Sequence, residues 1–225
     1  DVLFTNDWQK AVYEIYETFP KAGMVGTTPN SKLYKTHNDT FIFDTILNSK
    51  AKFRTVKNPE AMESFILSLG YKEFKPNIMK EKILSIKKNN TLAYSGTGHF
   101  TFTVKQKLIR SLKSVVVDEL ISSKNDAYYI DTAFTENGNW RLSTADNYTY
   151  HMGNIVENWM YDKLKIITPE KYSFENVPLI KSVKRNKYLI KIIKKFTSKI
   201  IRNKSFSKKY KILKGLNDYE ANQYI

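Results

Sequence analysis

Apolar positions in residues 1–29 follow spacings that indicate a strand, a helix and a second strand. Residues 1–4 form a strand-like run, and 24–26 form a short apolar segment before a Thr-Thr-Pro turn. Pro20 and Gly23 are expected to end the intervening helix. The apolar face of that helix would consist of Trp8, Ala11, Val12, Ile15, Tyr16 and Phe19. We therefore predict a βαβ unit and an α/β sheet.

The middle of the chain alternates between helical and extended patterns. Periodicity predicts helices over 59–69, 107–120 and 126–134, the first of them closed by Gly70. Extended segments are predicted at 41–43, 100–104 and 140–152. Residues 71–90 are polar and rich in lysine, which predicts a surface segment, and 94–99 have the composition of a loop.

The carboxyl-terminal part of the chain combines apolar and basic residues at helical spacing. We predict an amphipathic helix over about 181–214, with an apolar stripe formed by Leu189, Ile192, Ile193, Phe196 and Ile200. Such a helix can dock on an anionic membrane surface. It can equally pack its stripe against the protein core and leave a basic outer face in water. The pattern alone is compatible with both arrangements.

Charge is distributed unevenly along the 225 residues. The net charge of +15 suggests a nucleic-acid partner at first sight. Residues 181–225, however, hold 14 Lys and Arg against 2 Asp and Glu, whereas residues 1–180 hold 23 against 20. No nucleic-acid motif is found in residues 1–180, so nucleic acid is not the expected partner. The tail is the part that would contact an acidic surface.

Composition excludes several other classes of protein. A hydrophobic fraction of 41% is enough for a packed core, so disorder throughout is not expected. Because there is no cysteine, a disulfide framework and thiolate metal sites are excluded. No stretch approaches the roughly 20 apolar residues that span a bilayer. The chain begins at Asp1, without methionine and just before a strand-like run, so we expect a segment upstream.

Four motifs, in order, resemble the family 2 glycosyltransferases of the GT-A type. The first is residues 1–4 with the following helix and the run Phe19–Gly26, which is similar to the segment after the family's metal-binding Asp-x-Asp motif. The second is the glycine-rich run 96–105. The third is Asn125-Asp126 with Gly138 beyond it, although Asn125 departs from the family's acidic pair. The fourth comprises 140–144 and 150–154, similar to the family's RLST and HMGN runs.

The resemblance implies an inverting transfer of sugar from a nucleotide-sugar donor to a hydroxyl of a glycan or lipid-linked acceptor. Asp126 would be the catalytic base and Asp131 the second choice. Asp1 and His151 would bind a divalent cation, Mn²⁺ or Mg²⁺, or His151 would donate to the diphosphate. The predicted substrate-binding residues are Gly98, His99, Trp140 and Arg141.

Each of these residues also has a purely structural interpretation. Asp126 could be a helix N-cap, and His151 a packing residue. Arg141 could form an internal salt bridge, and Trp140 could belong to the core. His37 lies in a polar turn-like segment and receives no role. The functional interpretation of these side chains therefore depends on the resemblance.

Together, the pattern and the resemblance predict an α/β fold with part of a GT-A-like sheet. Residues 1–160 would form the carboxyl-terminal part of the catalytic domain, and 161–225 a basic, mainly helical tail. The donor-binding half would lie upstream of Asp1, so the chain alone is expected to be inactive. The resemblance implies a cytoplasmic protein, peripheral on the inner face of the cell membrane. The alternative is a non-catalytic basic module that binds nucleic acid or a membrane surface.

Overall fold

The computed structural model describes residues 2–72, 77–109, 130–132, 135, 137–153, 156–168, 183 and 185–224. The strands are β1 (Val2–Phe4), β2 (Ala22–Gly26), β3 (Ala51–Thr55), β4 (Lys82–Lys88), β5 (Thr91–Ser95), β6 (Phe102–Val104), β7 (Trp140–Thr144) and β8 (Thr149–His151). The helices are α1 (Trp8–Thr18), α2 (Asp39–Thr45), α3 (Pro59–Ser68), α4 (Ile78–Glu81), α5 (Gln106–Ile109), α7 (Asn158–Lys165), α8 (Lys187–Arg202), α9 (Lys204–Leu213) and α10 (Asp218–Gln223), with a 3₁₀ helix η1 (Ser31–Lys35). The predicted mixture of helices and strands is confirmed.

Six strands form a mixed sheet in the order β3-β4-β5-β7-β2-β6. Among these strands, β2 and β7 run parallel to each other, and the other neighbours are antiparallel. The residues of β2 and β7 are all buried. Both strands therefore lie covered on their two faces, as parallel strands usually do.

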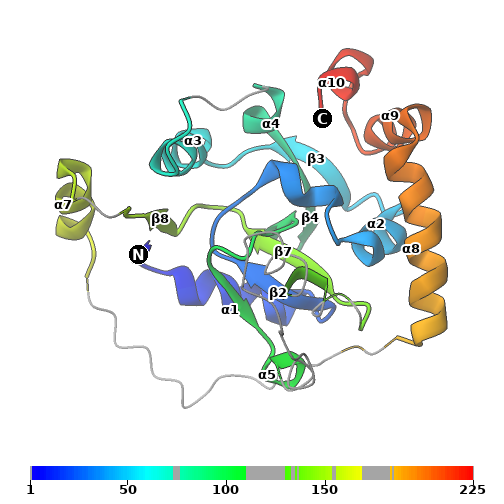
Figure 1. Cartoon of the computed structure of the whole chain (residues 1–225), viewed down its shortest axis with the longest axis horizontal. Helices are drawn as coiled ribbons and strands as arrows, with labels where there is room; N and C mark the ends of the chain where they lie inside the picture. The colour runs from blue at the N-terminus through cyan, green and yellow to red at the C-terminus, as the bar shows by residue number, and fades with distance from the viewer. Residues whose placement is uncertain are drawn as a thin grey trace, which may run out of the picture.

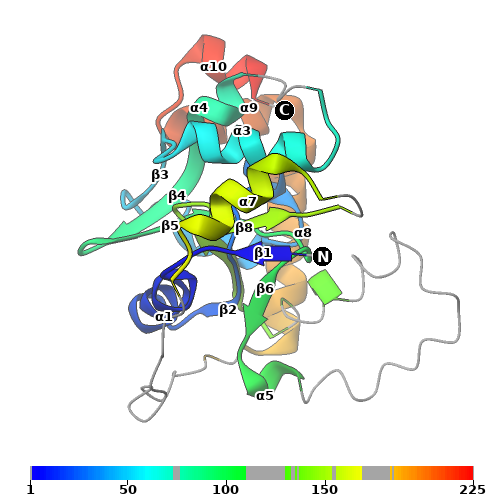
Figure 2. The same ribbon diagram turned by 90° about the vertical axis from the view of Figure 1, so that its left-hand side faces the viewer.

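The first strand does not belong to this sheet. β1 pairs with β8 in a separate antiparallel ribbon, with Val2 opposite His151. In Figure 2 this ribbon lies near the amino terminus, to one side of the main sheet. The predicted βαβ unit is therefore wrong, although its strand, helix and strand all form. The helix α1 connects strands of two different sheets, which the order of elements cannot reveal.

The apolar run at 41–43 is helical, so the predicted strand is wrong. These residues lie in α2, where Phe41 and Ile42 are buried and Phe43 is partly exposed. The hydroxyl of Thr45 donates to the carbonyl of Phe41 one turn earlier, at 2.7 Å. Periodicity cannot distinguish a three-residue apolar strand from one buried helix turn.

The lysine-rich segment 71–90 is also different from the prediction. It contains β4, where Ile83, Leu84 and Ser85 are fully buried inside the sheet between β3 and β5. Lysines before and after this short apolar run dominate the local composition. The surface prediction came from the composition of the whole segment, so it missed the four buried residues 83–86.

Helices enclose the sheet (Figure 1). The helix α1 packs against β2, β5 and β7, while η1 packs against β4 and β5, and α2 against β7. The helix α8 lies on the outer side of α2, as Figure 1 shows. Of the predicted helices, 107–120 is seen only as α5 and 126–134 only at 130–132, because the remainder lies outside the described residues.

The carboxyl-terminal helices share the core of the sheet. Tyr210, Leu216 and Tyr224 belong to the same buried cluster as the sheet residues. The ring of Tyr224 packs edge-on against Phe53 of β3 and against Tyr34 of η1. The predicted helical nature of this segment is confirmed for α8, α9 and α10, which pack as part of the body. Among the described helices, none combines the length and the apolar character that a membrane crossing needs.

Asparagine side chains begin several helices. The side chains of Asn58, Asn186, Asn203 and Asn217 accept hydrogen bonds from the first turns of α3, α8, α9 and α10. At Asn217 the cap is reciprocal, because the Glu220 carboxylate accepts from the Asn217 N–H. These caps explain where the helices of a lysine-rich and asparagine-rich chain start.

Candidate functional site

A buried ion pair between Asp131 and Arg141 lies at the centre of the candidate site. Arg141 extends from β7, and its Nη2 lies 2.9 Å from the Asp131 carboxylate. Both side chains are almost inaccessible to solvent. The guanidinium also donates to the backbone carbonyls of Thr36, at 3.1 Å, and Thr97. Arg141 is therefore an internal anchor that joins β7 to two loops, and its side chain is not presented to a substrate.

Asn38 holds the backbone of Arg141 in place. Its side-chain nitrogen donates to the Arg141 carbonyl, and its side-chain oxygen accepts from the Arg141 N–H, both at 3.0 Å. The same nitrogen donates to Ser95 at 2.8 Å. This buried amide acts as an additional strand neighbour for β7. It orients the arginine and, through it, the loops that the arginine contacts.

Two histidines lie within electrostatic range of the ion pair. Burial raises the pKa of Asp131, and the charges of Arg141, His99 and His37 oppose that rise. Burial and the Arg141 charge lower the pKa of His37, while Asp131 and Asp39 act in the opposite direction. His99 is exposed, so it is the member of this group that a substrate can reach. The group combines a buried carboxylate with imidazoles that can exchange protons.

His37 occupies an unusual backbone conformation. Its φ of 49° lies in the left-handed region that side chains other than glycine rarely adopt. Such conformations are retained where the surrounding structure enforces them, often at functional sites. Neither His37 nor Asn38 was expected from the sequence to have a role. The one available signal was the polar cluster Thr36-His37-Asn38-Asp39 in front of an apolar run.

The glycine-rich loop is shaped by its neighbours. Gly96 has a φ of 94°, and a Cβ there would collide with the backbone of Leu33 in η1. Its N–H donates to the carbonyl of Arg141 at 2.9 Å. Gly98 has no such constraint, since a Cβ at this position would lie 3.5 Å from the Leu33 side chain, which is an ordinary van der Waals contact. Gly96 is thus required by packing, whereas Gly98 and His99 lie on the more open part of the loop.

The same loop reaches the His151 region at its other end. The ring of Phe100 lies 5.6 Å from the ring of His151, measured between centroids. A network of threonine hydroxyls ties the segments together here, with Thr149 of β8 bonded to Thr27, Thr28 and Thr101 at 2.5–3.0 Å. The loop 96–101 therefore lies between the Asp131 group on one side and His151 on the other.

The hydrogen bond at His151 determines which of its nitrogens carries the proton. Its Nδ1 accepts from the backbone N–H of Gly153 at 3.1 Å. In the neutral ring the hydrogen is then on Nε2, which makes Nε2 a donor. A histidine that binds a metal through one nitrogen usually donates with the other. In this arrangement Nε2 can donate to an anionic oxygen.

The predicted metal site stays a prediction, because Asp1 lies outside the described residues. Within the described part of the chain, no group of three His, Cys, Asp or Glu could hold a metal. Asp126, the predicted base, also lies outside them. Val2, the covalent neighbour of Asp1, pairs with His151 across the β1–β8 ribbon.

Trp140 is a core residue, so its predicted role in substrate binding is not supported by its position. It is 7% exposed, and its ring packs edge-on against Phe41 of α2. Its indole N–H donates to Asp44 at 2.9 Å, and the Lys21 ammonium lies over the ring. Trp140 helps to fasten α2 to β7. The adjacent residue in the same motif, Arg141, is the one that reaches the candidate site.

A cavity of about 390 Å³ lies next to β8, between α3 and α7. Its walls include the aromatic rings of Tyr150 and Trp159 and the charged groups of Glu157 and Lys163. The Lys163 ammonium lies over the Tyr150 ring at 4.7 Å, and the Trp159 N–H donates to Glu157 at 3.0 Å. The volume is within the range of small-ligand pockets. A lining that combines aromatic rings with polar groups is suited to a ligand that has both apolar and hydroxyl surfaces.

No family model, no curated protein and no solved structure matches this chain.

Proposed function

We propose that this chain is the acceptor-side part of a glycosyltransferase that moves a sugar from a nucleotide-sugar donor to an acceptor hydroxyl. The acceptor is a glycan or a lipid-linked sugar, and the anomeric configuration is inverted. The proposal rests on the four motifs and on one structural observation. β1 follows the motif aspartate, Asp1, and it pairs with the strand that carries His151. Segments about 150 positions apart therefore meet, as a shared diphosphate site requires.

The reaction needs a base and a group that stabilises the leaving diphosphate. The acceptor oxygen forms a bond to the anomeric carbon, the base takes the hydroxyl proton, and the bond to the diphosphate oxygen breaks. Asp126 is the proposed base. Asp131 is the second candidate, and its raised pKa suits proton acceptance, but its pairing with Arg141 suits a positioning role better.

His151 is proposed to donate its Nε2–H to the departing diphosphate. Hydrogen-bond donors aimed at developing negative charge are a major source of rate enhancement in enzymes. The requirement for Mn²⁺ or Mg²⁺ stays a prediction of the resemblance, and no step described above depends on it. The cavity beside Tyr150 and Trp159 is the proposed acceptor pocket, because it adjoins β8 and joins aromatic and polar walls.

The test is transfer of labelled sugar by the full gene product from a panel of nucleotide sugars to lipid and glycan acceptors. His151→Ala should lower turnover by about 10²–10³-fold, the usual cost of losing one such donor. His151→Gln keeps an N–H near the position of Nε2 and should retain part of that activity. If both variants lose activity equally and also lose metal dependence, His151 is a metal ligand and the donor role is wrong.

Base assignment needs a parallel pair of variants. Asp126→Asn should lower turnover by about 10²–10⁴-fold without affecting donor binding. Asp131→Asn should act mainly on folding, which circular dichroism measures separately. If Asp126→Asn stays active and folded Asp131→Asn does not, the base is Asp131. Absence of transfer with every donor and acceptor would refute the glycosyltransferase proposal itself.

A further inference from the structure

The helices α8 and α9 form the most basic surface of the described chain. Residues 187–214 contain eleven lysines and arginines and no acidic residue. Two of these lysines are internal, because Lys211 donates to the carbonyls of Ala221 and Tyr224, and Lys214 to those of Thr45 and Asn48. Lys208 pairs with Asp218 at 2.7 Å. Within the described residues, the other eight make no ion pair.

One face of α8 is committed to the protein core. Ile190, Ile193 and Thr197 are buried, and the Thr197 hydroxyl donates to Asp39 of α2 at 2.5 Å. This face overlaps only in part with the stripe predicted from sequence, since Ile193 is buried whereas Leu189 and Ile192 are 44% and 64% exposed. Phe196 is 46% exposed, and its ring packs edge-on against Phe43 of α2.

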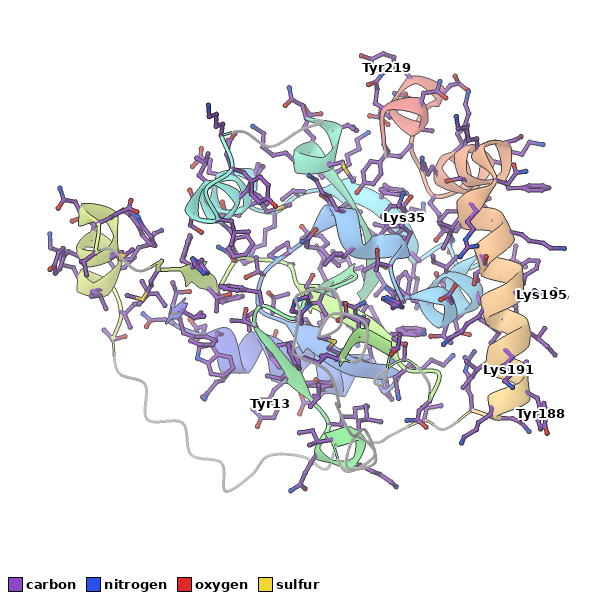
Figure 3. The ribbon with its side chains drawn as sticks, in the orientation of Figure 1. Tyr13, Lys35, Tyr188, Lys191, Lys195 and Tyr219 are labelled. Carbon is purple, nitrogen blue, oxygen red and sulfur yellow. The ribbon has the colours of Figure 1, made fainter. Side chains whose placement is uncertain are left out.

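The outer face therefore presents apolar and basic side chains together. Tyr188 and Ile192 are 78% and 64% exposed, and Phe206 of α9 is 54% exposed. Figure 3 shows Tyr188 and Lys195 reaching outward from α8, away from the sheet. This combination is the pattern of a helix that lies in a membrane interface.

A groove of about 550 Å³ separates the two helices. It is lined mainly by apolar side chains, among them Phe196, Phe206 and Leu213. Lys199 and Lys209 are the charged residues that contribute to its walls. The apolar side chains of the groove could contact a lipid acyl chain, and its two lysines could contact a negatively charged headgroup. We name this region, the exposed parts of α8 and α9 with the groove, the basic-apolar face.

Other occupants match this surface less well. A second copy of the chain would place two strongly positive faces against each other, which is repulsive. A nucleic acid would satisfy the lysines but would not need the exposed aliphatic side chains. An anionic bilayer satisfies both features, since basic residues near its surface and apolar residues in the headgroup region each contribute to binding.

We infer that the basic-apolar face docks the protein on an anionic lipid bilayer. This inference does not depend on the glycosyltransferase proposal, because none of its residues belongs to the candidate site. Docking by this face would hold the body at a lipid surface, with α7 on the side of the body that faces away from the bilayer (Figure 1). A membrane-binding protein without transferase activity would leave this inference intact and refute only the proposed function.

The test is co-sedimentation of the full protein with vesicles of phosphatidylcholine alone and of phosphatidylcholine with phosphatidylglycerol. Binding is expected only with the anionic vesicles, and it should weaken as salt is raised from 0.05 to about 0.5 M because the charges are screened. Lys191→Gln with Lys195→Gln should lower the affinity about 25-fold, or about fivefold for each lysine.

The apolar contribution is tested with matched helix variants. Ile192→Asp should lose vesicle binding and keep its fold, because the side chain is exposed. Leu164→Asp is the control, since it places the same charge on an exposed apolar position of α7, on the far side of the molecule (Figure 1). It should bind like wild type.

Three outcomes would overturn the inference. The first is equal binding to neutral and anionic vesicles, and the second is equal loss of binding in the Ile192 and Leu164 variants. The third is tight oligonucleotide binding that Ile192→Asp leaves unchanged, accompanied by no vesicle binding. That result would identify nucleic acid as the partner of the basic-apolar face.

Discussion

Arg141 and the lysines of α8 carry the same charge in opposite surroundings. Arg141 is enclosed, with Asp131 2.9 Å from its Nη2 and with the backbone carbonyls of Thr36 and Thr97 accepting from Nη1 and Nη2. Lys191 and Lys195 are exposed on a helix without acidic residues. A buried cation must be compensated by its neighbours and so becomes part of the architecture. An exposed one costs the fold little and remains available to a partner. The four predictions below test this contrast.

The largest effect is expected at the buried pair. Asp131→Asn removes the counter-charge of an inaccessible arginine and should reduce the free energy of unfolding by about 3–5 kcal/mol. Urea denaturation monitored by circular dichroism measures it. The double variant Asp131→Asn, Arg141→Met should recover part of the loss. A loss below about 1 kcal/mol in the single variant would mean that the pair is not structural.

A comparable effect should appear on α8, but only on its inner face. Ile193 is fully buried, and Ile193→Ala should cost about 2–5 kcal/mol in unfolding free energy. Ile192→Ala, one position earlier and exposed, should stay within about 0.5 kcal/mol of wild type. The same denaturation series measures both variants. Equal costs would show that α8 does not use the face seen here.

Protonation of His37 should have a smaller effect. Because its pKa is lowered from 6.5 in the folded protein, the unfolded chain takes up the proton first as the pH falls. His37 therefore stabilises the fold above pH 6.5, and this contribution is lost as the pH falls through its lowered pKa. His37→Gln should remove this pH dependence of the free energy of unfolding. The change should be less than about 1 kcal/mol, because the group is only half-buried and solvent screens its charge. Thermal melts between pH 7 and 5 compare the two proteins, and identical slopes would contradict the assignment.

The smallest effect is expected at the exposed cations. Lys195→Gln should change the free energy of unfolding by no more than about 0.5 kcal/mol, because the side chain has no ion-pair partner among the described residues. Denaturation in low and high salt is the measurement. A destabilisation above about 1 kcal/mol would show that Lys195, like Arg141, has a structural role.

Local patterns predicted helices more reliably than sheet membership. The spacing of Val12, Ile15 and Tyr16 identified both α1 and its buried face, since these are the residues buried there. In α8 the apolar residues cover a wider arc, and the predicted face overlaps only in part with the one that packs on α2. A narrow apolar stripe specifies which face of a helix is buried. With a broad stripe, the buried face depends on where the neighbouring helix packs.

The candidate site was only partly predictable. Asp131, His99 and Arg141 were named from the sequence, and the structure brings them into one electrostatic group. Trp140 was named as a substrate-binding residue with the core as its structural alternative, and its ring is buried against α2. His37 received no role, because the polar composition of its segment does not reveal that it lies near the Asp131–Arg141 pair. Asp1 and Asp126 lie outside the described residues, so their roles stay predictions.

By itself, the sequence determined the α/β class, the helical periodicity of α1 and α3, and the concentration of positive charge at residues 181–225. These depend on neighbours within a few positions along the chain. Only the tertiary structure decided that β1 leaves the main sheet to pair with β8, that β4 is buried despite its lysines, and that Arg141 is an anchor. These depend on contacts between residues that are tens to more than a hundred positions apart. Burial and charge pairing depend on which distant residues come into contact when the chain folds, and a local sequence pattern does not specify those residues.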